Sequence, residues 1–150
     1  MYKKVLLALD GSDNSKRAVE KVIEVAKTGN VEDVVAFHSV KHRYIPAEIQ
    51  EENLVPDAAW AHFVEAIQNA GATILEEAEA SFVAAGLQVE TRLVTDLSPE
   101  EYIINAVEEE GFDLVVLGCR GDHSRLRVLF LGSVANRVVN SAPCDVLIVR

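Results

Sequence analysis

The sequence predicts a doubly wound α/β fold, in which a parallel β-sheet carries helices on both faces. Short apolar runs of strand length alternate with longer segments of helical period, which is the pattern of a parallel sheet with crossover helices. The runs at residues 5–9, 114–117 and 146–149 are almost continuously apolar, as expected for strands that are covered on both faces. We therefore expect five parallel strands in one domain spanning residues 1–150.

The first helix has clear start and stop signals. Asp10-Gly11-Ser12 interrupts the first apolar run, and Ser12 or Asp13 supplies an oxygen that can cap a helix. Gly29-Asn30 would end this helix, because both residue types tolerate the left-handed backbone found at helix ends.

The middle of the chain combines a strand, an irregular segment and a long helix. Residues 34–40 are expected to form the second strand, and residues 41–56 contain two prolines and no consistent period, which indicates irregular chain. From residue 57 or 58 to residue 85 apolar side chains recur three or four residues apart, which predicts a long helix. Its expected inner face consists of Phe63, Ile67, Ala70, Ile74, Ala78 and Phe82.

The second half of the chain repeats this alternation. Residues 87–94 alternate apolar and polar side chains, as in a strand at or near a sheet edge. Ser98-Pro99-Glu100-Glu101 combines a serine cap, a proline in the first turn and a glutamate three residues after the cap, and so predicts a helix start. Gly111 would end that helix, and the valines from Val134 onward indicate a last helix before the final strand.

The segment after the strand at residues 114–117 has the features of a phosphate-binding loop. Gly118 and Gly121 would let the backbone adopt positive φ and approach an anion closely. Gly132-Ser133 opens the last helix, so free N–H groups, the helix dipole and a hydroxyl would face a phosphate there. The spacing matches neither a Walker A loop nor a GxGxxG fingerprint.

Asp10 ends the first strand at the same edge of the sheet. A carboxylate there can accept hydrogen bonds from ribose hydroxyls. It can equally well serve as a turn or helix-cap residue, and the residues alone leave both interpretations open.

Three segments resemble the universal stress protein family: residues 5–12, the glycine loop from Gly118 to Ser133, and residues 141–149. The likeness extends over essentially the whole chain. It implies a Rossmann-like sheet with strand order 3-2-1-4-5 and, as in the nucleotide-binding branch, an adenine nucleotide at the glycine loop. Ten residues separate Gly121 from Gly132 here, one more than in those members. We expect a bulge at residues 122–124 to absorb the extra residue.

The resemblance also implies which residues would contact the nucleotide. The Asp10 carboxylate would contact the nucleoside, Ala8 and Leu9 would form the wall beside it, and backbone groups at the end of the second strand, residues 37–40 with Ser39 among them, would face the adenine edge. Val40 would be a neighbouring apolar contact or part of the core. The full set of expected cofactor-binding residues is Ala8, Leu9, Asp10, Ser39, Val40, Gly118, Arg120, Gly121, Gly132, Ser133 and Val134. The cofactor would be ATP or another adenine nucleotide, with Mg²⁺ or Mn²⁺ bound through its oxygens.

Composition and charge exclude several kinds of partner. The net charge of −10 argues against nonspecific binding to nucleic acid or anionic lipid. No apolar stretch is long enough to span a membrane, and the N-terminal residues lack the features of a signal peptide. We therefore expect a cytoplasmic protein in which Cys119 and Cys144 stay reduced.

The arginines are unevenly distributed. Between Tyr44 and Val116 the one basic residue is Arg92, whereas Arg120, Arg125, Arg127 and Arg137 gather around the glycine loop. They could neutralise a polyphosphate or pair with the protein's own carboxylates.

The function that these features favour is a regulatory one, in which ATP binding changes the conformation or the choice of an unidentified protein partner. No catalytic constellation or metal-ligand cluster is evident in the sequence. Two alternatives stay open: a nucleotide-free dimeric stress or adaptor protein of the same family, and a slow ATP hydrolase. Residues 145–149 would leave an apolar strand with an exposed edge, so we expect a homodimer through this strand.

Overall fold

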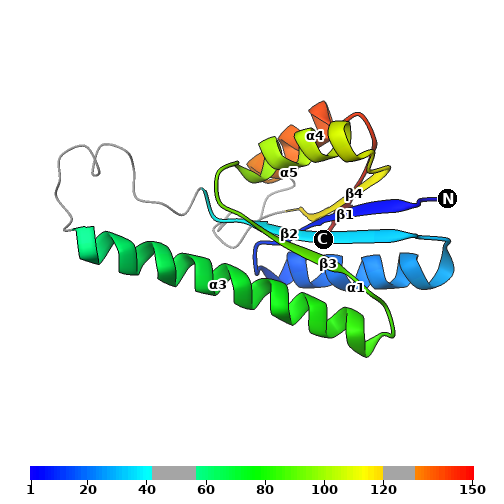
Figure 1. The fold of residues 1–150 in the computed structure, drawn as a ribbon. Helices are drawn as coiled ribbons and strands as arrows, with labels where there is room; N and C mark the ends of the chain where they lie inside the picture. Colours follow the sequence, from blue (N-terminus) through cyan, green and yellow to red (C-terminus); the bar gives the residue numbers. More distant parts are fainter. Residues whose placement is uncertain (42–56, 120–130) are drawn as a thin grey trace.

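The computed structural model describes residues 1–41, 57–119 and 131–150 (Figure 1). Its elements in chain order are β1 (Lys4–Ala8), α1 (Asp13–Thr28), β2 (Asp33–Ser39), α3 (Asp57–Ala84), β3 (Glu90–Val94), α4 (Pro99–Glu110), β4 (Leu114–Gly118), α5 (Ser133–Ser141) and β5 (Asp145–Val149). The strands form one sheet in the order β3-β2-β1-β4-β5, and every neighbouring pair is parallel. The predicted fold class and strand order are confirmed.

Helices cover both faces of the sheet. α1 and α3 lie on one face, and α4 and α5 lie on the other (Figure 1). Successive residues of β1 serve the two layers in turn: Val5 and Leu7 belong to the apolar core beneath α1 and α3, whereas Leu6 belongs to the core beneath α4 and α5. Because both sides of β1 are buried, its sequence is apolar at every position from Val5 to Leu7.

The helix starts predicted at Ser12 and Ser98 are confirmed. The Ser12 side chain accepts a hydrogen bond from the Ser15 N–H at the start of α1. At the start of α4, Ser98 and Glu101 form a reciprocal capping box, and Pro99 occupies the first turn. These signals could be read from the sequence because each involves residues only three positions apart.

The long helix α3 covers the sheet with only its C-terminal half. Its buried residues are Gly71, Leu75, Ala78 and Phe82, so the predicted inner positions Phe63 and Ala70, which are exposed, are wrong. The N-terminal half extends beyond the sheet in Figure 1, where none of the described strands lies beside it. Although α3 is long, none of the helices in the described ranges has the length and apolar character that a membrane span needs.

Most strand boundaries differ slightly from the prediction. β1 and β2 each begin and end one residue earlier than expected, and β3 begins at Glu90 rather than at residue 87. Leu87 and Val89 still pack against the core beneath α1 and α3, which explains their apolar character. Residues 42–56, for which irregular chain was predicted, lie outside the described residues.

Candidate functional site

The turn after β1 holds Asp10 in a fixed position. Its Oδ1 accepts hydrogen bonds from the Ser12 N–H at 2.9 Å and from the Ser12 hydroxyl at 2.5 Å. Its backbone N–H donates to the Ser15 hydroxyl at 3.2 Å. Gly11, between Asp10 and Ser12, has a φ of 81°, a left-handed conformation that glycine adopts without strain. The structure thus shows the turn role of Asp10 and leaves contact with a ligand as a prediction.

Both backbone groups of Leu9 form hydrogen bonds with residues of β2. Its N–H donates to the Phe37 carbonyl at 2.9 Å, and its carbonyl lies 2.6 Å from Nδ1 of His38. A carbonyl can only accept, so this ring nitrogen carries the proton. His38 is 2% exposed and therefore fixes the end of β1 from inside the protein. This role of His38 could not be predicted from the sequence, because the two residues are 29 positions apart.

The end of β2 is engaged within the protein. The Ser39 hydroxyl donates to the Leu97 carbonyl at 2.6 Å, which fastens β2 to the segment before α4. The Val40 N–H donates to the Val94 carbonyl at 2.9 Å, and the Val40 side chain is fully buried. Val40 packs in the core, which is one of the two roles expected for it, and its N–H is already bonded to the Val94 carbonyl. The carbonyl of Phe37 is likewise bonded within the sheet.

Gly118, at the end of β4, is explained by close packing. Among the described glycines positive φ occurs at Gly11, Gly86 and Gly111, so the positive φ expected at Gly118 is wrong. A Cβ built on Gly118 would lie 2.8 Å from the Cβ of Asn14, far inside a normal carbon contact. Gly118 therefore lets β4 approach the first turn of α1, which brings it close to the Asp10 turn.

The two ends of the predicted phosphate loop are joined by a hydrogen bond. The Gly132 N–H donates to the Cys119 carbonyl at 2.7 Å, and the Cys119 N–H donates to the Val149 carbonyl at 2.8 Å. The Asn14 amide lies 3.3 Å from the Cys119 sulfur, so α1 also contacts this point. Arg120, Gly121 and the expected bulge at residues 122–124 lie outside the described residues.

The first turn of α5 begins at this anchor. Gly132 is the N-cap residue, and no side chain in the described part of the protein caps the turn. The first backbone N–H bonded in the helical pattern is that of Asn136, which donates to the Gly132 carbonyl. Ser133 is exposed, whereas Val134 is partly buried against the core beneath α4 and α5. Uncapped N–H groups and the positive end of the helix dipole give this turn the properties of an anion site.

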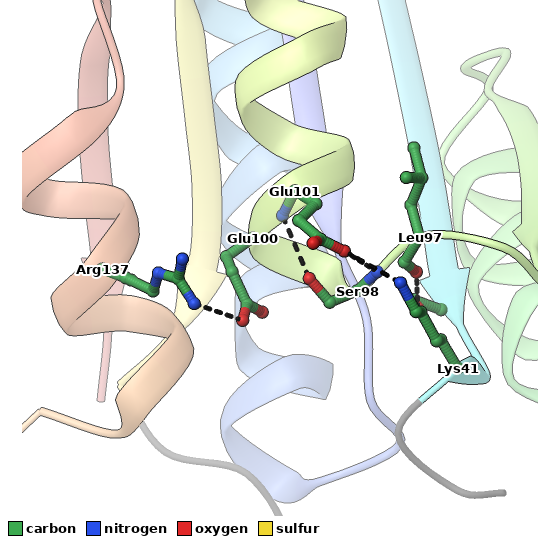
Figure 2. Close-up of polar contacts among 7 residues, drawn as sticks. Lys41, Leu97, Ser98, Glu100, Glu101 and Arg137 are labelled. Atoms are coloured by element: carbon green, nitrogen blue, oxygen red, sulfur yellow. Dashed lines mark hydrogen bonds and ion pairs between the residues drawn. The ribbon is translucent and has the colours of Figure 1, made fainter. Parts of the chain in front are cut away.

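The first turn of α4 lies beside α5 at the same end of the sheet and is rich in polar contacts (Figure 2). The Glu101 carboxylate accepts from the Ser98 N–H at 2.9 Å and pairs with Lys41 at 3.2 Å. The Ser98 N–H is the main reason why the pKa of Glu101 is lowered to about 2. Glu100 pairs with Arg137 of α5 at 3.3 Å. For Arg137 the alternative of pairing with the protein's own carboxylates is therefore confirmed, while Arg125 and Arg127 lie outside the described residues.

The contacts join most of the described predicted residues into one region at the carboxyl ends of the strands. Asp10 reaches Gly118 through the first turn of α1, and β4 reaches Gly132 through Cys119. Ala8 pairs with Phe37 in the β1–β2 register, and the Leu9 N–H donates to the Phe37 carbonyl. Ser39 ends β2 and pairs with Val94 of β3. Within the described ranges no three His, Cys, Asp or Glu side chains cluster closely enough to hold a metal ion.

Comparisons with known proteins find similarity over the whole chain. Residues 1–150 match the sequence model of the Universal stress protein family. Universal stress protein YxiE of Bacillus subtilis (strain 168) is 35% identical over 159 positions, with all of both chains covered. The solved structure of MJ0577 of Methanocaldococcus jannaschii superposes with a TM-score of 0.80 at 27% identity, covering 99% of this chain and 96% of that one. A universal stress protein solved in complex with cAMP has a TM-score of 0.65 at 29% identity, covering 99% and 97% of the two chains.

Proposed function

The chain belongs to the universal stress protein family, and on that premise we propose that it binds ATP or another adenine nucleotide at the carboxyl ends of β1 and β4. β1 and β4 are neighbours in the sheet. The chain continues from β1 into α1 on one face of the sheet, but it enters β4 from α4 on the other face. Strand order reverses at this point, which is where open α/β sheets bind ligands.

The observation that carries this proposal is the first turn of α5. Its N–H groups lack a side-chain cap in the described structure, and the Gly132–Cys119 hydrogen bond fixes it beside the end of β4. A phosphate group would supply the missing acceptors and the negative charge that a helix N-terminus favours. The complex of a similar universal stress protein with cAMP supports an adenine nucleotide as the ligand.

The nucleoside would lie across the turn after β1. The Asp10 carboxylate would accept hydrogen bonds from the ribose hydroxyls, and Ala8 and Leu9 would form the adjoining wall. Mg²⁺ or Mn²⁺ would accompany a triphosphate through the phosphate oxygens, as hard cations prefer. Binding would act as a regulatory signal that alters the conformation or the affinity for a protein partner. The nucleotide-free adaptor is the alternative that the following experiment separates from this proposal.

Ser133→Glu distinguishes phosphate binding from helix stability. Ser133 is exposed at the first position of α5, where a carboxylate favours the helix but would repel a phosphate. We expect Ser133→Glu to keep or raise the thermal midpoint of unfolding and to weaken ATP binding at least about tenfold, a difference of about 1.4 kcal/mol. Isothermal titration calorimetry would measure the ATP affinity.

Ser133→Gln is the matched control, because it adds a similar side chain without charge. It should bind ATP more tightly than Ser133→Glu. Equal ATP affinities for Ser133→Glu and wild type would place the phosphates away from α5 and contradict the proposal. A wild-type protein that binds no ATP at millimolar concentration would favour the nucleotide-free adaptor.

A further inference from the structure

A mostly buried carboxylate connects the two helices whose N-termini meet at the carboxyl edge of the sheet. Glu100 lies in the first turn of α4, and its side chain is 10% exposed. Its Oε1 lies 3.3 Å from Nη1 of Arg137 on α5, whose side chain is 68% exposed. Figure 2 shows the two side chains directed toward each other between the helices. The pair therefore has a fixed acidic member inside and a basic member that faces solvent.

Arg137 is well placed to act at the first turn of α5. It follows Ser133 by four residues, so the two side chains lie on the same face of the helix. Four residues span about 6 Å along the axis, and helical side chains lean toward the N-terminus. The guanidinium group is therefore within reach of an anion bound at the uncapped turn.

The ion pair leaves Arg137 with binding capacity. Within residues 1–41, 57–119 and 131–150, Glu100 is the one carboxylate paired with Arg137, through a single nitrogen. A guanidinium group has five N–H donors in a rigid plane. Once one edge is held by a carboxylate, the plane has a defined direction, and its other donors can bind a second oxyanion.

Glu100 itself is held in place more firmly than its partner. It lies near the N-terminus of α4, where the helix dipole favours a carboxylate, and the adjacent capping box fixes the start of that helix. A long, exposed arginine without such a contact would adopt many rotamers. Holding it in advance reduces the entropy that a ligand must overcome.

We infer that Glu100 is a positioning residue for phosphate recognition, which orients Arg137 toward the terminal phosphates of a nucleotide bound at the first turn of α5. The inference rests on the proposed function and adds the charged side chain, Arg137, that would contact the phosphates. Simple charge repulsion predicts that the negative charge of Glu100 weakens the binding of a polyanion. The inference predicts the opposite, because the Glu100 carboxylate orients Arg137.

The test compares the binding of ATP and adenosine by isothermal titration calorimetry in wild type, Glu100→Gln, Arg137→Gln and the double variant. Each single variant is expected to weaken ATP binding roughly tenfold, because a charge-assisted contact is lost, and to leave adenosine binding unchanged. The double variant should bind ATP no more weakly than Arg137→Gln, since the inference assigns the effect of Glu100 to the orientation of Arg137. General destabilisation would instead affect both ligands.

Glu32→Gln is the matched control for removing one negative charge. Glu32 pairs with Lys3 at 2.8 Å just before β2 begins, at the opposite edge of the sheet, so its loss should not weaken ATP binding. If Glu100→Gln binds ATP as tightly as Glu32→Gln or more tightly, the inference is overturned.

Three further outcomes are also decisive. Arg137 is exposed, so Arg137→Gln should fold even if Glu100→Gln does not, and ATP binding unchanged in Arg137→Gln would overturn the inference by itself. Wild-type protein that binds neither ATP nor adenosine would overturn the proposed function together with the inference, whereas wild-type binding with unaffected variants would overturn the inference alone.

Discussion

Asp10 has a structural role that can be separated from contact with a ligand. Its Oδ1 accepts two hydrogen bonds from Ser12, and an asparagine at this position could still accept them through its carbonyl oxygen. Asp10→Ala should lower the free energy of unfolding by about 1–2 kcal/mol, because the turn loses both contacts, and Asp10→Asn should lower it by less.

Chemical denaturation and ATP titration of both Asp10 variants would check this prediction. Asp10→Asn should retain most of the stability but weaken ATP binding, because ribose hydroxyls donate more strongly to a carboxylate than to an amide. Equal destabilisation by Asn and Ala would contradict the turn role, and unchanged ATP affinity in Asp10→Asn would contradict ribose contact.

The residues of the site differ in how far the sequence could predict their roles. Ser12 and Ser98 were predictable as caps because their partners lie three positions away. The roles of His38 and Gly118 depend on Leu9 and Asn14, which are distant in the chain and close only after folding. The pattern of a glycine after a strand therefore predicts a positive φ at Gly118, whereas the close packing of Asn14 requires only that Gly118 has no side chain.

At the scale of elements, Gly71 explains how α3 approaches the sheet. A Cβ at this position would lie 2.8 Å from Leu93 Cδ1, 2.9 Å from His38 Cδ2 and 3.1 Å from Val40 Cγ1. Glycine in a helix interior lowers helix stability relative to alanine, but here the extra methyl group has no space. Gly71 is thus required by the contact of α3 with β2 and β3.

Gly71→Ala should consequently destabilise the protein, although alanine favours helices. We expect a loss of about 1–3 kcal/mol from overpacking, measured by urea denaturation. Ser81→Ala, at an exposed position of the same helix, serves as the control and should be close to neutral. A Gly71→Ala variant that is more stable than wild type would show that α3 can move away from the sheet at no cost.

The start of α4 should contribute to the pH dependence of stability. The pKa of Glu101 is lowered from 4.5 to about 2, chiefly by the hydrogen bond from the Ser98 N–H. A carboxyl group with a lowered pKa in the folded state stabilises the protein above its unfolded pKa, and this contribution is lost as the pH falls through the folded pKa. The contribution of Glu101 is therefore complete above pH 4.5 and lost between pH 4.5 and about 2.

Glu101→Gln should remove this part of the pH dependence. The difference in unfolding free energy between wild type and variant should be largest above pH 4.5 and should shrink toward pH 2, as measured by denaturation across that range. Glu109→Gln, which removes an exposed charge from the same helix, is the control. A difference that is constant with pH would contradict the role of the Glu101 carboxylate.

At the scale of the whole molecule, β5 is an edge strand whose apolar side chains are only partly covered. It pairs with β4 on one side, and Val146, Leu147, Ile148 and Val149 are all of intermediate exposure. An edge of this kind invites pairing with another chain. We propose that two copies associate through β5, which would cover these side chains.

Ile148→Asp should abolish that association. By size-exclusion chromatography with light scattering we expect a dimer for the wild type and a monomer for the variant, and we expect the variant's far-UV circular dichroism spectrum to remain native. Thr91→Asp places the same charge on β3 at the other edge of the sheet and should remain dimeric. A folded Ile148→Asp variant that stays dimeric would contradict the β5 interface.

The architecture was more predictable than the site. Continuous apolar runs such as that of β4 mark strands buried on both faces, and helix caps mark the segments between them, so the alternation of elements follows from local patterns. Strand order came from the family resemblance, since periodicity does not encode it. The sequence could not show that only the C-terminal half of α3 covers the sheet. Periodicity identifies the apolar face of a helix, but it does not show how far the sheet beneath that face extends.

The most direct test of nucleotide binding is the nucleotide content of freshly purified protein. Wild type and Ser133→Glu would be denatured in parallel, and the supernatants would be separated by ion-exchange chromatography. The proposal predicts adenine nucleotide in the wild-type sample and little or none in the variant. If neither sample contains nucleotide, and the wild type takes up none when ATP is added at millimolar concentration, the protein does not bind ATP and the proposed function is wrong.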